Sequence, residues 1–468
     1  MTDPLIFPLT HLPFDITELI LGRIESRRDL VSFAATSTAC KELVIPRHTE
    51  YRTLRLSGHP DVWAHLAERP DLARNIRDVT ICEAAWKTSA EPQRYPTTLI
   101  LADTASRLDT DDVVIANICK ALRSMEFLHS FTWIEAWTPG GAYIDIPHYY
   151  NDVFQVLKDS KSLVQFKVVD NIVQRGISVP EEIEEYPLWH ICDLQTLSLR
   201  QLGWWPQGVD MLLARSPNLQ NLDIRLPLDA SLLAPCHFPQ LRRVNLNFSP
   251  TGSASEQVIV EFLQRHPTVE DLRWYPRHDT LSLTHGSLPN LKSLITTPPL
   301  ACSILSDPTV PNRAIVCISQ VSLDESTLAI LDAIDTSQLR DIRVWKYSGM
   351  EAVNDLAQRL PQLTHLEIPQ FGIPTRNDTA NDQTYTIDDY VLILSKFRSL
   401  EYLIDSSIWP ALKLGGEEKI TSLAVLCPSL QRLGYYNTQK SEYVDIVLHR
   451  DGGKFSWTQE EAKREWYD

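Results

Sequence analysis

The stretch SPNLQNLDIRL, residues 216–226, joins a proline to a short run in which apolar and polar residues alternate. Its apolar positions are Leu219, Leu222 and Ile224. Alternation with a period of two is typical of a strand with one buried face. Pro217 fits just before the run because proline cannot continue a helix and favours extended backbone in the residue that precedes it. The stretch therefore predicts the end of a helix followed by a short strand.

The same pattern, L-x-x-L-x-[ILV], recurs beyond residue 150 at intervals of 22 to 48 residues. The longest interval conceals a further unit at residues 313–321, and helical segments lie between strands at 256–267, 327–337, 350–361 and 419–428. Repetition at this period, with strand and helix alternating, predicts a solenoid in which each unit buries its apolar face against its neighbours. The pattern starts at Leu163, Leu194, Leu219, Leu241, Val269, Leu291, Leu339, Leu363, Leu400 and Leu430.

These units resemble leucine-rich repeats, most closely in LCPSLQRLGYYN at residues 426–437. They depart from that family where an Asn or Cys should follow the strand, because Leu202, Pro227 and Ser249 stand there. The resemblance implies an α/β fold, an irregular horseshoe with parallel strands on its concave side. An unrelated α/β fold with this periodicity is the alternative.

The solenoid is expected to span residues 51–455 and to begin with less regular units. Residues 51–56, 76–81 and 127–134 have strand character, and residues 111–125 have the pattern of a helix. At the other end, Thr458 and Glu461 have the spacing of a capping box. Residues 456–468 are therefore predicted to form a C-terminal capping helix, which would cover the last open edge of the solenoid.

The N-terminal stretch HLPFDITELILGRIESRRDLVSFAATSTACKELVIP, residues 11–46, predicts three short helices. Asp15 and Glu18 are spaced as a capping box for the first helix, and Ser26 can start the second. Ile16, Leu19, Ile20 and Ile24 recur at helical spacing, but three such helices bury little surface on their own. Some apolar positions have no evident use in so small a core and are expected to pack on the rest of the chain or on another protein, notably Leu12, Pro13, Ile16, Ile20 and Leu30.

This stretch resembles an F-box in its Leu-Pro opening, its acidic residue, its Ile/Leu-rich helix and its Asp-Leu pair. It departs at Thr38, where many members of the family have a basic residue. The resemblance implies an F-box over residues 8–50 that binds the adaptor subunit of an SCF-type ubiquitin ligase, whereas a plain helical cap is the alternative. The residues that the resemblance assigns to adaptor binding are Leu12, Pro13, Asp15, Ile16, Ile20, Ile24, Leu30, Ser37 and Lys41.

Charge and composition exclude several classes of partner. A formal net charge of −16 provides no general field for nucleic acid or for an anionic membrane surface. The sequence has no secretory signal pattern and no apolar run long enough to span a membrane. Its eight cysteines are scattered without a C-x-x-C spacing, which favours reduced thiols and a cytoplasmic or nuclear location.

Catalytic signatures are missing from the sequence. It contains no H-E-x-x-H, no G-x-S-x-G and no P-loop pattern. The acidic cluster Asp109, Asp111 and Asp112 suits a helix N-terminus better than a metal site. We expect no catalytic residue, no cofactor, no metal and no small-molecule substrate.

The polar positions of the predicted strands define a candidate target-binding surface. Because apolar positions face the core, the alternate positions face the open side of the sheet. Arginine and exposed aromatic side chains are enriched in protein-binding hot spots, whereas an ordinary solvated sheet face is the alternative. The candidate residues are Arg200, Arg225, Arg243, Arg273, Tyr275, Arg343, Trp345, Arg432 and Tyr436.

The combined resemblance implies a substrate-recognition subunit of an SCF-type E3 ubiquitin ligase. Through the adaptor the chain would join a cullin–RING ligase, and through its repeats it would bind a target protein whose identity the sequence does not give. A protein-binding scaffold without ligase function is the main alternative, and an enzyme on an unrecognised α/β fold is a third.

Overall fold

The structure is a computed structural model whose elements fall into two compact units. The first comprises residues 1–238 and 248–251, and the second comprises residues 239–247 and 252–468. The residues described are 12–24, 26–45, 47–56, 60–82, 94–96, 111–134, 150–169, 185–200, 206–226, 230–248, 254–278, 281–310, 313–325, 328, 331–332, 335–347, 349–368, 386–405, 408, 417–437, 442–451 and 454–461.

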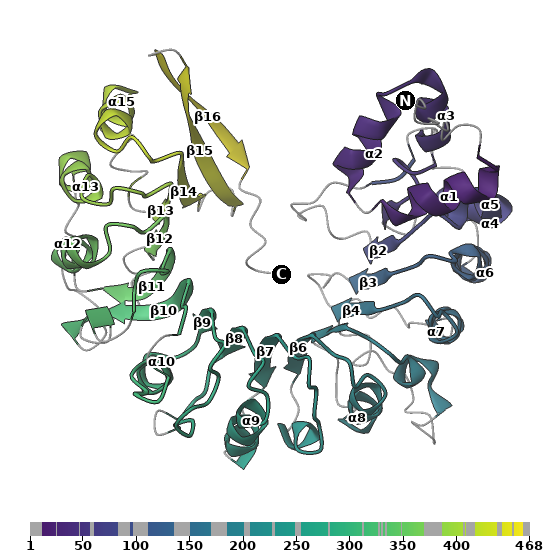
Figure 1. Ribbon diagram of the computed structural model, residues 1–468, viewed down its shortest axis with the longest axis horizontal. Helices are drawn as coiled ribbons and strands as arrows, with labels where there is room; N and C mark the ends of the chain where they lie inside the picture. Colours follow the sequence, from purple (N-terminus) through teal and green to yellow (C-terminus); the bar gives the residue numbers. More distant parts are fainter. Residues whose placement is uncertain are drawn as a thin grey trace, which may run out of the picture. The chain divides into compact units, whose positions relative to one another are not determined.

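The first unit opens with three short helices and continues with strands that alternate with helices (Figure 1). The opening helices are α1 (Phe14–Arg23), α2 (Arg27–Ala34) and α3 (Thr38–Val44). The strands lie side by side in chain order, and helices α4, α6 and α7 cover one face of them. The elements that follow α3 are β1 (Thr53–Leu56), α4 (Pro60–Glu68), α5 (Pro70–Ala73), β2 (Asp78–Cys82), α6 (Asp111–Ser124), β3 (Ser130–Ile134), α7 (Tyr150–Lys158), β4 (Gln165–Val169), η4 (Pro187–His190), β5 (Thr196–Arg200), α8 (Pro206–Ala214), β6 (Asn221–Leu226) and η5 (Ala230–Leu233).

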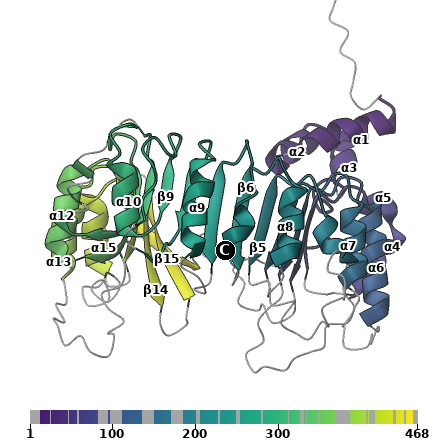
Figure 2. The ribbon, with the colours of Figure 1, turned by 90° about the horizontal axis from the view of Figure 1, so that it is seen from below.

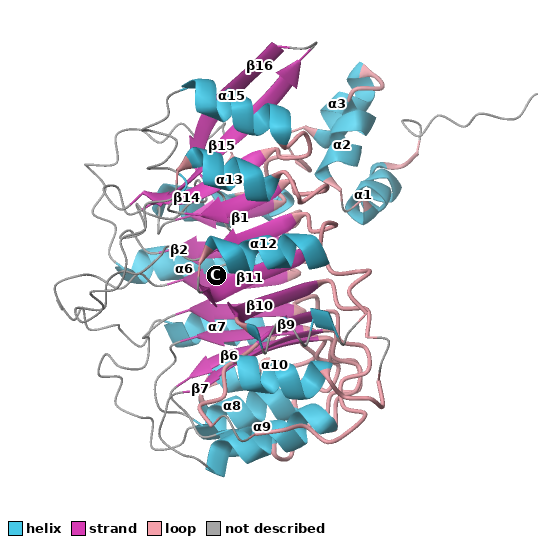
Figure 3. Ribbon diagram, turned by 90° about the vertical axis from the view of Figure 1, so that its left-hand side faces the viewer, coloured by secondary structure: helices cyan, strands magenta, loops and turns pink. Residues whose placement is uncertain are grey.

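The second unit repeats this alternation, with α9, α10, α12 and α13 following one another along it (Figure 2). Helices α12, α13 and α15 lie against one face of its strands (Figure 3). Its elements are β7 (Arg243–Phe248), α9 (Ala254–Gln264), β8 (Asp271–Trp274), β9 (Ser293–Ile295), α10 (Pro298–Leu305), β10 (Cys317–Leu323), β11 (Asp341–Tyr347), α12 (Met350–Arg359), β12 (His365–Ile368), α13 (Ile387–Leu394), β13 (Tyr402–Asp405), α15 (Glu417–Leu426), β14 (Arg432–Asn437), β15 (Glu442–Asp451) and β16 (Lys454–Glu461).

Parallel pairing places equivalent apolar residues of successive repeats in register. In the first unit each pair from β1 to β6 is parallel, and one row of paired residues is fully buried along its whole length. A second such row lies two residues further along each strand, as the period of a strand requires. The first row consists of Leu54, Val79, Phe131, Phe166, Leu197 and Leu222.

The second unit has the same kind of row from β7 to β14, again through parallel pairs. Strand β10 belongs to the unit predicted at residues 313–321, although a bulge shifts its register against β11 near Val321. The predicted solenoid of the leucine-rich-repeat type is therefore confirmed. The row consists of Val244, Leu272, Leu294, Ile318, Ile342, Leu366, Leu403 and Leu433.

The less regular start of the solenoid also follows the prediction, since β1, β2, α6 and β3 occupy the expected segments. The outer edge of β1 is bridged by residue 94, whose backbone exchanges two hydrogen bonds with Arg55 at 2.8 and 2.9 Å. The helix predicted at 327–337 lies largely outside the described residues.

The predicted C-terminal helix at 456–468 is wrong for residues 456–461, and the remaining residues lie outside the described part. Residues 454–461 form β16, which pairs with β15 in an antiparallel hairpin, and β15 pairs in the same way with β14. Phe455 and Trp457 are half-buried while Ser456 and Thr458 are exposed. This alternation with a period of two favours a strand, and it overrides the local capping-box spacing of Thr458 and Glu461.

A buried arginine secures an irregular connection in the second unit. The Arg313 guanidinium donates hydrogen bonds to the carbonyl oxygens of Ser287 (2.8 Å), Leu288 (3.3 Å) and Ile304, and it lies 3.5 Å from Asp307. Hydrogen bonds to the Asp307 carboxylate, above all from the Thr309 hydroxyl, hold the pKa of Asp307 well below its usual range. This ionised carboxylate balances the buried guanidinium.

Substituting alanine for two helical glycines, Gly208 and Gly22, should change the stability in opposite directions. A Cβ at Gly208 in α8 would overlap the buried indole ring of Trp189, with 2.7 Å to its Nε1, whereas a Cβ at Gly22 in α1 would meet only Arg77 Nη2 at 3.8 Å. We expect Gly208→Ala to lower the free energy of unfolding by about 1–3 kcal/mol through overpacking. Gly22→Ala should raise it by up to about 1 kcal/mol through helix propensity. Chemical denaturation of both variants measures the difference, and equal effects would contradict the packing at Trp189.

Candidate functional site

The three N-terminal helices share a small core of their own. Leu21, Leu30, Ala34 and Val44 are buried in it, and Ile24, Phe33 and Leu43 pack against it. Ser26 caps α2 by accepting a hydrogen bond from the backbone amide of Asp29 (3.2 Å), as the sequence predicted. Ser37 caps α3 in the same way through the amide of Cys40 (3.1 Å). One face of α1 is committed to this core.

The opposite face of α1 exposes a stripe of large apolar side chains. Ile16, Leu19 and Ile20 are 43%, 55% and 36% exposed. Their spacing places them next to one another on the helix, and Pro13 just before it is also exposed. Side chains of this kind are usually buried, so a contiguous exposed set indicates an interaction surface. We call Ile16, Leu19 and Ile20 the α1 stripe.

The remaining residues assigned to adaptor binding lie in different environments. Leu12 is half-buried, Lys41 is exposed in the last turn of α3, and the side chain of Asp15 lies outside the described part. Leu30 is fully buried and Ile24 packs beside it, so both serve the core rather than the surface. Leu19 was not among the residues assigned to adaptor binding, although the helical periodicity placed it on the same face of α1 as Ile16 and Ile20.

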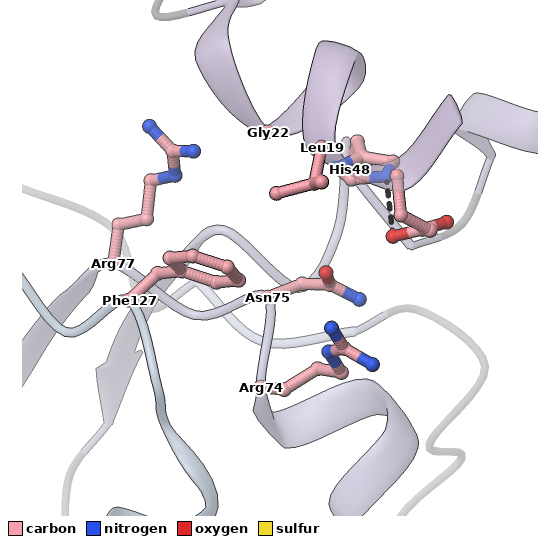
Figure 4. Close-up of a pocket in the computed structure, with 8 residues that line it drawn as sticks. Leu19, Gly22, His48, Arg74, Asn75, Arg77 and Phe127 are labelled. Carbon is pink, nitrogen blue, oxygen red and sulfur yellow. Dashed lines mark ion pairs between the residues drawn. The ribbon is translucent and has the colours of Figure 1, made fainter. Parts of the chain in front are cut away.

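The predicted capping box at Asp15 and Glu18 is wrong. Helix α1 begins at Phe14, and its N-cap, Pro13, has no side chain that could accept a hydrogen bond. Glu18 turns instead towards the end of the three-helix segment, where its carboxylate lies 3.2 Å from His48 Nε2 (Figure 4) and 3.6 Å from Arg47. Burial lowers the pKa of His48 despite this neighbouring carboxylate, so His48 is neutral at neutral pH.

Arg52 connects α1 to the first strand of the solenoid. Its buried guanidinium donates hydrogen bonds to the carbonyl oxygen of Leu21 (2.5 Å) and to that of Ile24, both at the C-terminal end of α1. A cation is favourable there because these carbonyls carry the negative end of the helix dipole. Burial lowers the pKa of Arg52 to about 10, which leaves it charged at neutral pH. Arg52 therefore fixes the orientation of α1 against β1.

The open strand face of the first unit is polar and partly paired in charge. Arg200 contacts the Asp223 carboxylate at 2.6 Å, and Arg225 contacts the same carboxylate at 3.4 Å. The Ser198 hydroxyl donates a further hydrogen bond to it (2.9 Å). The two predicted arginines are thus brought together, but Asp223 neutralises part of their charge. Parallel register adds a row that the sequence analysis missed, namely Arg55, Thr80, Thr132 and Lys167.

The other predicted residues lie on strands of the second unit. Arg243 is 70% exposed and pairs with Asp271 at 2.9 Å, whereas Arg343 is nearly buried between Asp341 (3.1 Å) and Glu367 (3.9 Å). Arg273 lies over the ring of Tyr275, 6.0 Å from its centroid. Arg432 is exposed, while the side chains of Trp345 and Tyr436 lie outside the described part. Among the predicted arginines of this face, Arg243 and Arg432 are the exposed ones.

Metal sites and membrane spans were both sought among the described residues. They contain no group of three or more His, Cys, Asp or Glu side chains placed to hold a metal ion. None of the described helices has the length and apolar character needed to cross a membrane. All eight cysteines lie within the described ranges and are free thiols.

The fold defines the chain as a leucine-rich-repeat-like solenoid protein. Comparison with known proteins does not narrow this class further. No family model matches the sequence, and none of the curated proteins searched matches it either. Among solved structures, the chain is similar to one in the crystal structure of the Rad7 and Elc1 complex in yeast. The TM-score is 0.41 at 11% identity, over 92% of this chain and 88% of that one.

The Arg52 contact predicts a specific loss of stability. Arg52→Met should lower the free energy of unfolding by about 2–4 kcal/mol, because it leaves two buried carbonyls without their charged donor. Arg69→Met is the control, since Arg69 and its partner Asp71 are both half exposed and such pairs contribute little. Denaturant unfolding measures both variants, and hydrogen exchange should quicken in residues 14–23 of Arg52→Met alone. Equal stability of the two variants would contradict the proposed role of Arg52.

Proposed function

We propose that this protein is the substrate-recognition subunit of an SCF-type E3 ubiquitin ligase. Residues 8–50 act as an F-box that binds the adaptor subunit, and the repeats bind the target protein. The observation that carries the proposal is the α1 stripe, three large apolar side chains exposed on a helix that already has its own core. A helix needs no such stripe for its own folding, and a docked partner would remove it from water.

The proposed mechanism is proximity rather than chemistry by this chain. The adaptor links the protein to a cullin–RING ligase, and the open strand faces hold the target near the charged conjugating enzyme. The gain is a high effective concentration of a target lysine, which depends on fixed geometry between the two binding surfaces. The rigid attachment of α1 by Arg52 suits this role. In this proposal the protein works in the cytoplasm or nucleus without a cofactor.

A non-ligase scaffold is the second candidate. The observation that favours it is the extent of the open strand faces, which exist in both units independently of α1. A scaffold would bind its partners through these faces whether or not an adaptor is present. Whether the wild-type chain binds the adaptor therefore distinguishes the two candidates.

Charge placed on the α1 stripe should abolish adaptor binding. Ile16→Asp and Leu19→Asp should each weaken binding of a purified SCF adaptor by about 30-fold or more, the loss typical of a hot-spot residue. Leu392→Asp is the matched control, because Leu392 is 66% exposed on α13. Titration calorimetry with the full chain measures the affinity. If the wild-type chain does not bind the adaptor, the ligase proposal fails and the scaffold gains.

Reversing the charge on the open strand face should abolish the binding of target proteins without affecting the binding of the adaptor. The double variant Arg243→Glu with Arg432→Glu changes exposed arginines only, which spares the buried Arg343 network. Arg265→Glu with Arg359→Glu, on the helical side, is the control. Mass spectrometry of co-purified proteins should show partners lost from the first variant alone. An unchanged set of partners would place target binding elsewhere.

A further inference from the structure

The strands of the second unit end in an open edge at β16. This strand pairs with β15 over eight consecutive positions without a register shift (Figure 1), and among the described residues no strand pairs with its other edge. With eight residues, β16 is longer than any of the parallel strands β7 to β14. An open edge presents backbone N–H and C=O groups that pair readily with another strand. The outer edge of β16 is therefore a candidate docking site for a further strand.

The sequence of β16 lacks the usual protection of an edge strand in its middle. Natural proteins protect such edges with prolines, bulges, charged side chains or very short strands. Residues 455–459 read FSWTQ, without proline, glycine or a charged residue. The charges of the strand stand at its two ends, with Lys454 first and Glu460 and Glu461 last. The middle of β16 can therefore accept a further strand, and the charges at its ends can select which one.

Two half-buried aromatic side chains lie along this edge. Trp457 is paired with Leu448 of β15, and Phe455 is paired with Arg450. Leu448 is buried, and the Arg450 guanidinium donates hydrogen bonds to two carbonyl oxygens at the C-terminal end of α15 (3.2 Å each), so the two aromatic rings face the helical side of the sheet. Helix α15 is the last helix among the described residues. A strand added to β16 would cover both rings further.

A second copy of β16 is complementary to this edge in one antiparallel register. When Trp457 lies opposite Trp457 of the copy, Ser456 lies opposite Thr458 and Lys454 lies opposite Glu460, each pair occurring twice. Directly opposed residues share one face of an antiparallel sheet, so both copies keep their aromatic rings on the same side. Each chain carries a net charge of −16, so contact between copies requires local pairing of opposite charges. This register supplies it.

We propose that two copies of this chain associate through the outer edges of β16, as antiparallel strands with a two-fold axis at Trp457. Backbone hydrogen bonds join the strands, and the two pairs of Lys454 with Glu460 fix the register. Thr458 keeps its contact with His449 (2.9 Å), since a hydroxyl can donate and accept at once. The inference does not depend on the proposed function, because a ligase subunit and a scaffold would equally gain avidity from two copies of each binding surface.

Charge swaps at the ends of β16 test the pairing in sedimentation experiments on the full chain. The wild-type chain should form a reversible dimer with a Kd on the order of 10 μM, as expected of a small interface. Lys454→Glu and Glu460→Lys each place like charges opposite one another twice, and each should weaken dimerisation about 10-fold or more. An equal mixture of the two variants should regain dimerisation, because every opposed pair is then attractive. Positions 454 and 460 lie about 20 Å apart along one strand, so no contact within a chain could produce this recovery.

Glu351→Lys is the control, because it changes the net charge as Glu460→Lys does but lies exposed on α12. It should dimerise like the wild-type chain, and thermal unfolding checks that all variants fold. A wild-type chain that stays monomeric at about 100 μM would overturn the inference, since the edge would then be left to another protein or covered by the chain itself. Single variants that dimerise normally, or a mixture without recovery, would overturn it too.

Discussion

The structure depends on the burial of register rows that no single repeat could bury alone. Each strand contributes one apolar residue to a row, and that residue is covered by its neighbours in the row and by the helices on that face, as Phe154 of α7 covers Phe166. Every repeat therefore requires a neighbour, and the two terminal strands require some other cover. In the first unit the backbone at residue 94 bridges the free edge of β1. In the second unit the β15–β16 hairpin extends the sheet beyond β14.

Buried arginines solve a related problem where the chain leaves this regular pattern. Arg52 satisfies carbonyls at the end of α1, and Arg313 satisfies three carbonyls around an irregular connection in the second unit. Both groups replace backbone partners that a regular repeat would supply, since buried carbonyls need a donor. At α1 the consequence is functional. The helix is held by its C-terminal end and by the face that packs on the core, so the α1 stripe stays exposed to solvent.

The parts of this fold that follow from local pattern could be predicted from the sequence. Strand positions follow from the period of two, and Ser26 and Ser37 cap helices as their local chemistry requires. The predictions fail where contacts with residues distant in the sequence outweigh the local pattern. Glu18 does not cap α1 but contacts His48, thirty residues further along the chain. Residues 454–461 extend a sheet instead of forming a helix.

Pairing across strands also decides which arginines can recognise a partner. Arg200 and Arg343 pair with a carboxylate on the next strand, and Arg225 pairs with Asp223 of its own strand. An incoming acidic group would therefore have to displace Asp223, Asp341 or Glu367. Such an exchange gains little free energy, because one ion pair replaces another. Arg243 can be released at lower cost, since its pair with Asp271 is mostly solvated. The partly buried pairs fix side-chain positions on the open face, and the exposed arginines are the ones left to bind.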